Sequence, residues 1–208
     1  VITSMAQPLG THIGNALEVK DAIDVLAGRT QGDLLEISLL LGSHMLVLAE
    51  KAKTLPEARA MLENALSSGV GLRKLAEMIA AQGGDPRVVE DLSLLPQAAV
   101  KRVMRAETAG YLSAMDTTAL GMAAQRMGAG RAKKSDMLDY SVGYVLHVRL
   151  GDEVTEDTPL ATLYARNEAE AEEAEKAIRK ALTIAREKPQ TPKLWDAVVT
   201  ADGITYNR

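Results

Sequence analysis

The chain has 208 residues, of which 47% are apolar and 25% are charged, and its formal net charge is −4. This composition is typical of one or two globular domains and excludes a disordered chain. The slightly acidic balance argues against a nucleic-acid partner, which would require a basic face. The absence of cysteine excludes disulfides, thiolate catalysis and cysteine-bound metal, and we expect a cytoplasmic protein. No apolar run approaches the roughly 20 residues that span a bilayer, so we expect no membrane partner.

The chain opens with a predicted strand followed by a bend. Val1–Met5 is apolar enough for a short buried strand, Pro8–Gly14 forms the bend, and a helix follows from Asn15. Such strand-to-helix bends often lie at ligand sites in α/β proteins. A buried strand needs neighbours on both sides, and the next segments predict none. We therefore expect the chain to begin inside a domain, as the carboxyl-terminal part of a longer protein.

Four helices are predicted in the first half, and the glycines that follow them are typical helix ends. Asp33 with Glu36, and Thr54 with Glu57, have the spacing of capping boxes. The predicted helices are Asn15–Leu26, Asp33–Lys51, Thr54–Ser67 and Gly71–Gln82.

The second half predicts a mixture of strands and helices. The expected strands are Val100–Ala106, Gly110–Met115, Asp139–Leu150 and Pro159–Tyr164, and the expected helices are Asp116–Met127 and Glu168–Ala185. The fold is accordingly expected to be an α/β class with a separate α+β carboxyl-terminal domain. The expected divisions are a partial α/β domain at 1–85, a connector at 86–99, an α+β domain at 100–190 and an irregular tail at 191–208.

Two sets of residues closely resemble the pyrimidine-nucleoside phosphorylases, relatives of thymidine phosphorylase. The first set is Gln7-Pro8-Leu9-Gly10 with Gly14-Asn15-Ala16-Leu17-Glu18-Val19-Lys20. The second comprises Gly128–Lys134, Asp139, Val142-Gly143, His147, Gly151–Val154 and Pro159–Ala161. The resemblance covers about residues 1 to 190. Its second part also looks like the half-barrel of biotinyl and lipoyl domains. No lysine stands at the tip that such a carrier needs, so we expect no organic cofactor.

The resemblance implies an activity for a longer protein. Such an enzyme is a pentosyltransferase that cleaves uridine, deoxyuridine or thymidine with phosphate, giving free base and pentose 1-phosphate, and it is expected to be a cytoplasmic homodimer. The family's phosphate loop and pyrimidine-gripping residues have no counterpart in this sequence. We therefore predict no catalytic or substrate-binding residue here, and we expect the chain alone to be inactive.

One binding site is implied by the same resemblance. The family binds a monovalent cation, usually potassium, and three of its ligands match Leu9 and His12, through backbone oxygens, and Asp21, through its carboxylate. Hard oxygen donors suit hard cations. Asp21 stands where the family usually has Glu, and the shorter side chain weakens the expected contact.

Other candidate sites have simpler structural interpretations. Asp139, Ser141 and His147 share one face of the predicted strand, but same-face neighbours lie about 7 Å apart, too far for a catalytic relay. Gly128–Arg131 is interpreted as a helix end with a basic turn in preference to a phosphate-binding loop. His44 lies on a long predicted helix and is expected to be a packing or interface residue, and the acidic run 168–175 is expected to form a solvated helix face.

Two other function classes remain open. The chain could be a non-catalytic binding or scaffold module of the biotinyl type, and release of base by the longer protein would discriminate against it. A related phosphoribosyltransferase shares the helical and α/β architecture but would lack the carboxyl-terminal domain.

Overall fold

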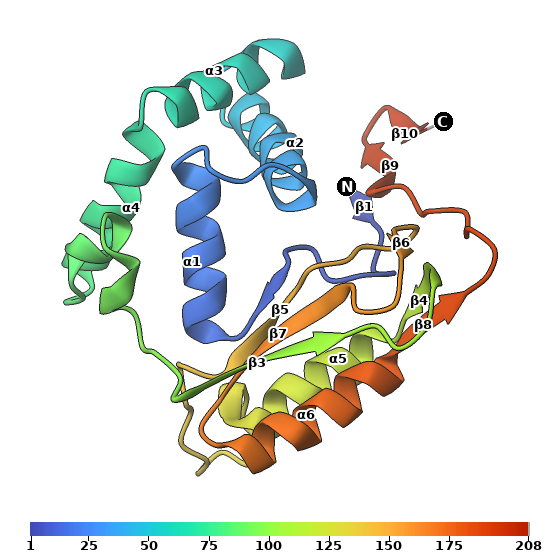
Figure 1. Ribbon diagram of the computed structural model, residues 1–208. Helices are drawn as coiled ribbons and strands as arrows, with labels where there is room; N and C mark the ends of the chain where they lie inside the picture. The colour runs from blue at the N-terminus through green and yellow to red at the C-terminus, as the bar shows by residue number, and fades with distance from the viewer. Residues whose placement is uncertain (208) are drawn as a thin grey trace. The chain divides into compact units, whose positions relative to one another are not determined.

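The computed structural model describes residues 1–207, and these residues contain six α-helices and three antiparallel sheets (Figure 1). They form two compact units. The helical unit comprises residues 19–95, and the carboxyl-terminal unit comprises residues 2–18 together with the chain from Pro96 onward. The chain crosses between the units within helix α1 and again after Leu95.

All four predicted helices of the first half are present. They are α1 (Asn15–Leu26), α2 (Asp33–Leu48), α3 (Leu55–Ser67) and α4 (Val70–Ala81), followed by the 3-10 turns η1 (Pro86–Val89) and η2 (Leu92–Leu94). Thr54 caps α3 as predicted, because its side chain accepts a hydrogen bond from the Glu57 backbone N–H at 3.3 Å. The predicted cap of α2 is wrong, since Gly32 is the capping residue and Asp33 is already helical.

The helical unit has two small apolar cores. Ile23 packs with Val88 and Val89 in one core, and Val25 packs with Leu35 and Leu39 in the other. Several apolar side chains of α2 remain exposed, including Met45 and Leu48. No strand lies among residues 19–95, so this unit is all-helical. The two strands of the expected domain at 1–85, β1 (Ile2–Thr3) and β2 (His12–Ile13), belong to the carboxyl-terminal unit.

The carboxyl-terminal unit holds every strand that the structure describes. The four-stranded sheet has the order β2 (His12–Ile13), β5 (Gly143–Leu146), β7 (Pro159–Ala165) and β3 (Val100–Arg105). One three-stranded sheet has the order β6 (Glu153–Val154), β4 (Gly110–Met115) and β8 (Leu182–Ala185). The other has the order β1 (Ile2–Thr3), β9 (Trp195–Thr200) and β10 (Gly203–Tyr206).

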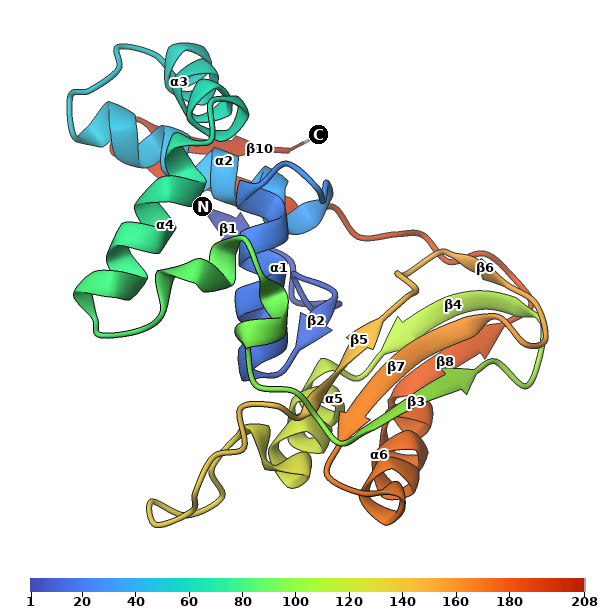
Figure 2. The same cartoon turned by 60° about the vertical axis from the view of Figure 1, so that its left-hand side comes forward.

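Two helices of this unit, α5 (Thr117–Ala124) and α6 (Glu168–Ala181), lie side by side and cover the strands β3 and β7 (Figures 1 and 2). Asp116 caps α5 as predicted, accepting from the Ala119 N–H at 2.9 Å. A π-helical turn, η3 (Gln125–Ala129), continues α5 to the glycines that were predicted to end it. Apolar side chains of both helices, of the four-stranded sheet and of the β6-β4-β8 sheet share one core, which includes Met104, Leu120, Tyr144, Leu163 and Ile178.

The prediction of a buried opening strand is wrong. Ile2 and Thr3 are exposed and pair antiparallel with β9, at the registers Ile2↔Ala197 and Thr3↔Trp195. The expected irregular tail at 191–208 is therefore wrong as well, because β9 and β10 form a hairpin within it. The neighbour of the first strand lies in this tail, about 190 residues later in the chain, where the sequence pattern predicts no strand.

The helix predicted over Glu168–Ala185 is four residues too long. Helix α6 ends at Ala181, and β8 begins at the next residue and pairs with β4. The strand predicted over Asp139–Leu150 is in turn too long, because only Gly143–Leu146 is extended in the sheet and residues 140–141 form a turn.

Candidate functional site

The opening segment lies along the residues around β5. β2 pairs antiparallel with β5 at His12↔Val145 and Ile13↔Tyr144, and the Leu146 N–H donates to the Thr11 carbonyl at 2.8 Å. Farther along, the Leu150 N–H donates to Gln7 Oε1 at 2.9 Å. Residues 7–13, which we call the opening loop, are thus fastened at both ends to the carboxyl-terminal unit.

Two glycines make the close approach at one end of this loop. Gly143 has φ 147°, and a Cβ added there would lie 2.1 Å from the Ile13 carbonyl oxygen. Gly14 has φ 134°, and its Cβ would lie 2.4 Å from the Val142 carbonyl oxygen. Only glycine fits such contacts, so these residues allow the two backbones to meet.

Arg149 lies at the middle of the opening loop and contacts its carbonyl oxygens. Its Nη1 donates to the Pro8 oxygen at 2.7 Å and approaches the Gly10 oxygen at 3.4 Å, while Nη2 approaches the Leu9 oxygen at 3.4 Å. The Arg149 backbone N–H donates to Asp152 Oδ2 at 2.7 Å. Three successive carbonyl oxygens therefore point toward one guanidinium. Arg149 is not among the residues predicted from the sequence.

The three residues that the resemblance implies as cation ligands are divided between the two units. Leu9 and His12 belong to the opening loop of the carboxyl-terminal unit, and Asp21 belongs to the helical unit. Asp21 is only 4% exposed on α1. One helical turn along, the buried Asp24 is paired with Lys20 Nζ at 2.6 Å and Arg29 Nη1 at 3.2 Å.

The donor chemistry of these residues fits a hard monovalent cation. Backbone carbonyls and a buried carboxylate are hard oxygen ligands. A carbonyl oxygen has two lone pairs, so the 3.4 Å contact of Leu9 with Arg149 leaves acceptor capacity. The guanidinium charge of Arg149 beside the Leu9 oxygen opposes the binding of a cation there.

The structure does not assemble a catalytic relay at Asp139, Ser141 and His147. Asp139 Oδ1 accepts from the Ser141 hydroxyl at 2.6 Å and from its backbone N–H at 3.0 Å, because these residues form a turn and not the extended strand expected. His147 Nε2 is instead 2.7 Å from Thr162 Oγ1. Burial, and secondarily the charge of Lys101, lower the pKa of His147.

The basic turn after η3 is closed by its own residues. The Asp136 carboxylate accepts from the Ala132 and Lys133 backbone N–H groups at 3.1 and 2.8 Å, and the Arg131 Nε donates to the Asp136 carbonyl at 3.1 Å. These amides are therefore engaged by an internal carboxylate, which agrees with the interpretation of this segment as a helix end.

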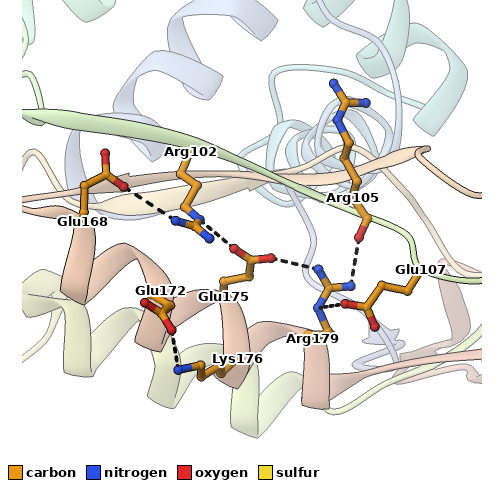
Figure 3. A network of polar contacts seen from close by, with 8 residues as sticks. All are labelled: Arg102, Arg105, Glu107, Glu168, Glu172, Glu175, Lys176 and Arg179. Atoms are coloured by element: carbon orange, nitrogen blue, oxygen red, sulfur yellow. Dashed lines mark hydrogen bonds and ion pairs between the residues drawn. The ribbon is translucent and has the colours of Figure 1, made fainter.

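A charged network fastens α6 to β3 (Figure 3). Glu175 accepts from Arg102 Nε at 2.7 Å and from Arg179 Nη2 at 2.9 Å. Arg179 also contacts Glu107 and donates to the Arg105 carbonyl at 2.9 Å. Glu175 is therefore not part of a solvated acidic face as expected for residues 168–175. Its partners come from 73 residues earlier and from the next helical turn, so no local pattern identifies it.

Among residues 1–207, no three acidic or histidine side chains cluster as a metal site would require. Within the same part of the chain, no helix combines the length and the apolar character needed to cross a membrane.

The fold of the carboxyl-terminal unit corresponds to a domain class found in nucleoside phosphorylases. Residues 111–185 match the family model of the pyrimidine nucleoside phosphorylase C-terminal domain. They cover nearly all of β4 and the whole of α5, η3, β5, β6, β7, α6 and β8.

The wider comparison agrees with this match. The chain is 46% identical over 200 residues to the pyrimidine-nucleoside phosphorylase of Bacillus subtilis (strain 168), and 49% identical over 168 residues to that of Geobacillus stearothermophilus. It is 41% identical over 200 residues to the enzyme of Staphylococcus aureus (strain USA300). These matches cover 96%, 81% and 96% of this chain, and 46%, 39% and 46% of the relatives. The chain is thus related to the pyrimidine-nucleoside phosphorylases, and it spans about half the length of the relatives it matches.

Proposed function

We propose that this chain is the carboxyl-terminal part of an enzyme that phosphorolyses pyrimidine nucleosides. Its substrates would be uridine, deoxyuridine or thymidine together with phosphate, and its products free base and pentose 1-phosphate. The single observation that supports this proposal is the 46% identity over 200 residues with the enzyme of Bacillus subtilis (strain 168). The match to a named phosphorylase domain at 111–185 is consistent with it.

Catalysis in this proposal depends on groups outside the 208 residues. Phosphate attacks the anomeric carbon while positive charge develops on the sugar, and stabilising that charge and the departing base is electrostatic work. The resemblance provides no residue of this chain for either task. The chain contributes the carboxyl-terminal unit and the opening loop, and we propose that it is inactive alone.

A monovalent cation, potassium by resemblance, forms part of the proposal. The carbonyl oxygens of Leu9 and His12 and the carboxylate of Asp21 would hold it, and when bound it would supply positive charge to the loop that receives phosphate. Two contacts would orient the opening loop: the Arg149 guanidinium with the Pro8 carbonyl oxygen, and the Gln7 side chain with the Leu150 N–H. A cytoplasmic location and a homodimeric complete enzyme also belong to this proposal.

We also propose that the carboxyl-terminal unit is related to the biotinyl half-barrels and acts as a non-catalytic support. The short antiparallel strands, and the core shared by the four-stranded sheet and the β6-β4-β8 sheet, are consistent with such a role. The expected domain boundaries at residues 85 and 99 stay a separate proposal.

The test is an exchange of matching halves. In the Bacillus subtilis enzyme, the part that this chain matches would be replaced by residues 1–208, and base release from uridine and thymidine would be measured with and without phosphate. We expect phosphate-dependent release from the hybrid and none from this chain alone. The intact relative serves as the positive control. A folded hybrid without release would contradict the proposed reaction, and release by the isolated chain would contradict its dependence on the other half.

A further inference from the structure

The opening loop has an unusual arrangement of polar groups. The carbonyl oxygens of Pro8, Leu9 and Gly10 all lie within 3.4 Å of a guanidinium nitrogen of Arg149. Carbonyl oxygens that converge on one point repel one another, because each is the negative end of its dipole. A charged hydrogen-bond donor at that point therefore stabilises this conformation.

Arg149 provides such a charged donor as part of the chain itself, so no separate ion has to bind. Its planar guanidinium carries several N–H donors in fixed directions, which suits neighbouring acceptors better than an ammonium group does. Hydrogen bonds from a charged donor are also about twice as strong as neutral ones. The closest, to the Pro8 oxygen at 2.7 Å, has the short distance typical of this kind.

Two backbone amides report on whether the loop stays attached. The Leu146 N–H donates to the Thr11 oxygen at 2.8 Å, and the Leu150 N–H donates to Gln7 Oε1 at 2.9 Å. These amides lie on either side of Arg149 in sequence, and both of their acceptors belong to the opening loop. If the loop detaches, both lose their partners.

We propose that Arg149 is a positioning residue that holds the opening loop in its folded conformation, and that this conformation does not require a bound cation. Arg149 acts on the loop that carries Leu9 and His12 and does not itself touch substrate. The importance of this loop for phosphorolysis rests on the proposed function, whereas its attachment by Arg149 does not.

The test is hydrogen exchange, resolved by NMR at the Leu146 and Leu150 amides of this chain. The wild type, Arg149→Gln, Arg149→Lys and the control Arg126→Gln would be compared in potassium chloride and in tetramethylammonium chloride. Arg126 is an exposed arginine of the same unit. We expect Arg149→Gln to accelerate exchange at both amides about tenfold, in line with the loss of charged hydrogen bonds. Arg149→Lys should restore part of the protection, and Arg126→Gln should match the wild type in both salts.

The amides of β3 and β7 distinguish local detachment from general destabilisation. In Arg149→Gln they should exchange as in the wild type, because their hydrogen bonds do not involve the opening loop. Unchanged exchange at Leu146 and Leu150 would overturn the role of Arg149, and so would equal acceleration throughout the unit. Wild-type protection that appears only with potassium would overturn independence from the cation. None of these measurements uses enzymatic activity, so failure of the proposed reaction would be visible separately.

Discussion

Glu175 Oε2 accepts a hydrogen bond from Arg102 Nε at 2.7 Å, which joins the middle of α6 to strand β3. The same carboxylate accepts from Arg179 through its other oxygen at 2.9 Å. The Glu175 side chain is only 19% exposed, so its two contacts with arginines in the network of Figure 3 are partly shielded from water. The carboxylate is thus the shared acceptor of two cations, and its removal affects both.

We expect Glu175→Gln to lower the free energy of unfolding by about 1–2 kcal/mol, because the amide replaces a charged acceptor with a neutral one beside two arginines. Urea denaturation followed by circular dichroism measures this change. The control is Glu172→Gln, which removes the exposed pair with Lys176 at 2.6 Å and should have a much smaller effect, because exposed ion pairs contribute little to stability. Equal effects of the two changes would contradict a special role for Glu175.

The contribution of Glu175 should depend on pH. Burial raises the pKa of this carboxyl, but hydrogen bonds from Arg179 and Arg102 outweigh burial and leave its pKa below the usual value. The folded state therefore favours the ionised form. The resulting stability is present above the unfolded pKa of about 4.3 and is lost as the pH falls through the lower folded pKa. The difference between wild type and Glu175→Gln should shrink on acidification below about pH 4. A constant difference from pH 7 to pH 3 would count against this account.

Tyr144 is predicted to stabilise the unit through its hydroxyl as well as its ring. The ring is fully buried, and the hydroxyl donates to the Leu120 carbonyl at 2.8 Å, which links β5 to α5. Burial raises the pKa of this hydroxyl, so it remains a donor across the physiological range. Tyr144→Phe leaves the buried Leu120 carbonyl without this donor and should cost about 1–2 kcal/mol in thermal or urea unfolding. Tyr140→Phe, at an exposed tyrosine, should change stability by less than about 0.5 kcal/mol.

Gly143→Ala should detach the opening loop at its β2 end. The new methyl group would lie 2.1 Å from the Ile13 oxygen, and the backbone has φ 147°, so both the contact and the conformation oppose it. We expect a loss of at least about 2 kcal/mol and faster exchange of the Leu146 amide. Gly121→Ala is the matched control, because no atom lies within 4 Å of its Cβ position on α5. That change should be neutral or stabilise by up to about 1 kcal/mol. Similar losses at both glycines would contradict the steric argument.

The sequence predicted the local elements well where capping residues and glycines are close in the chain. Asn15–Leu26 was located to the residue, and the Thr54 and Asp116 caps form as predicted. Local signals failed where pairing decides the structure. Leu182–Ala185 continues a helical pattern, yet β4 takes it as a strand, and the tail became a hairpin beside Ile2. Neither the strand at Leu182–Ala185 nor the hairpin can be predicted from a short stretch of neighbouring residues.

The candidate site shows the same contrast between features that a short stretch of sequence encodes and features that depend on distant residues. The family resemblance identified the opening loop through its residue motif, without any structure. Arg149 was not identified, because its partners lie about 140 residues earlier in the chain. A single arginine before a Gly-Asp turn has no pattern that distinguishes it from a surface arginine. Asp139 and Ser141 were judged too distant to bond because the strand was extended too far into the turn.

The junction of α6 and β8 has a consequence for how the unit tolerates change. Ala181 ends the helix and Leu182 begins the strand, so the chain has no spare residue between them. The rotation of α6 about its own axis therefore determines which side chains of β8 face the core. Inserting one residue would turn each β8 side chain to the opposite face, unless the helix rotated by about 100° to compensate. Length variation in this domain is thus expected in its turns, while this junction should keep a fixed length.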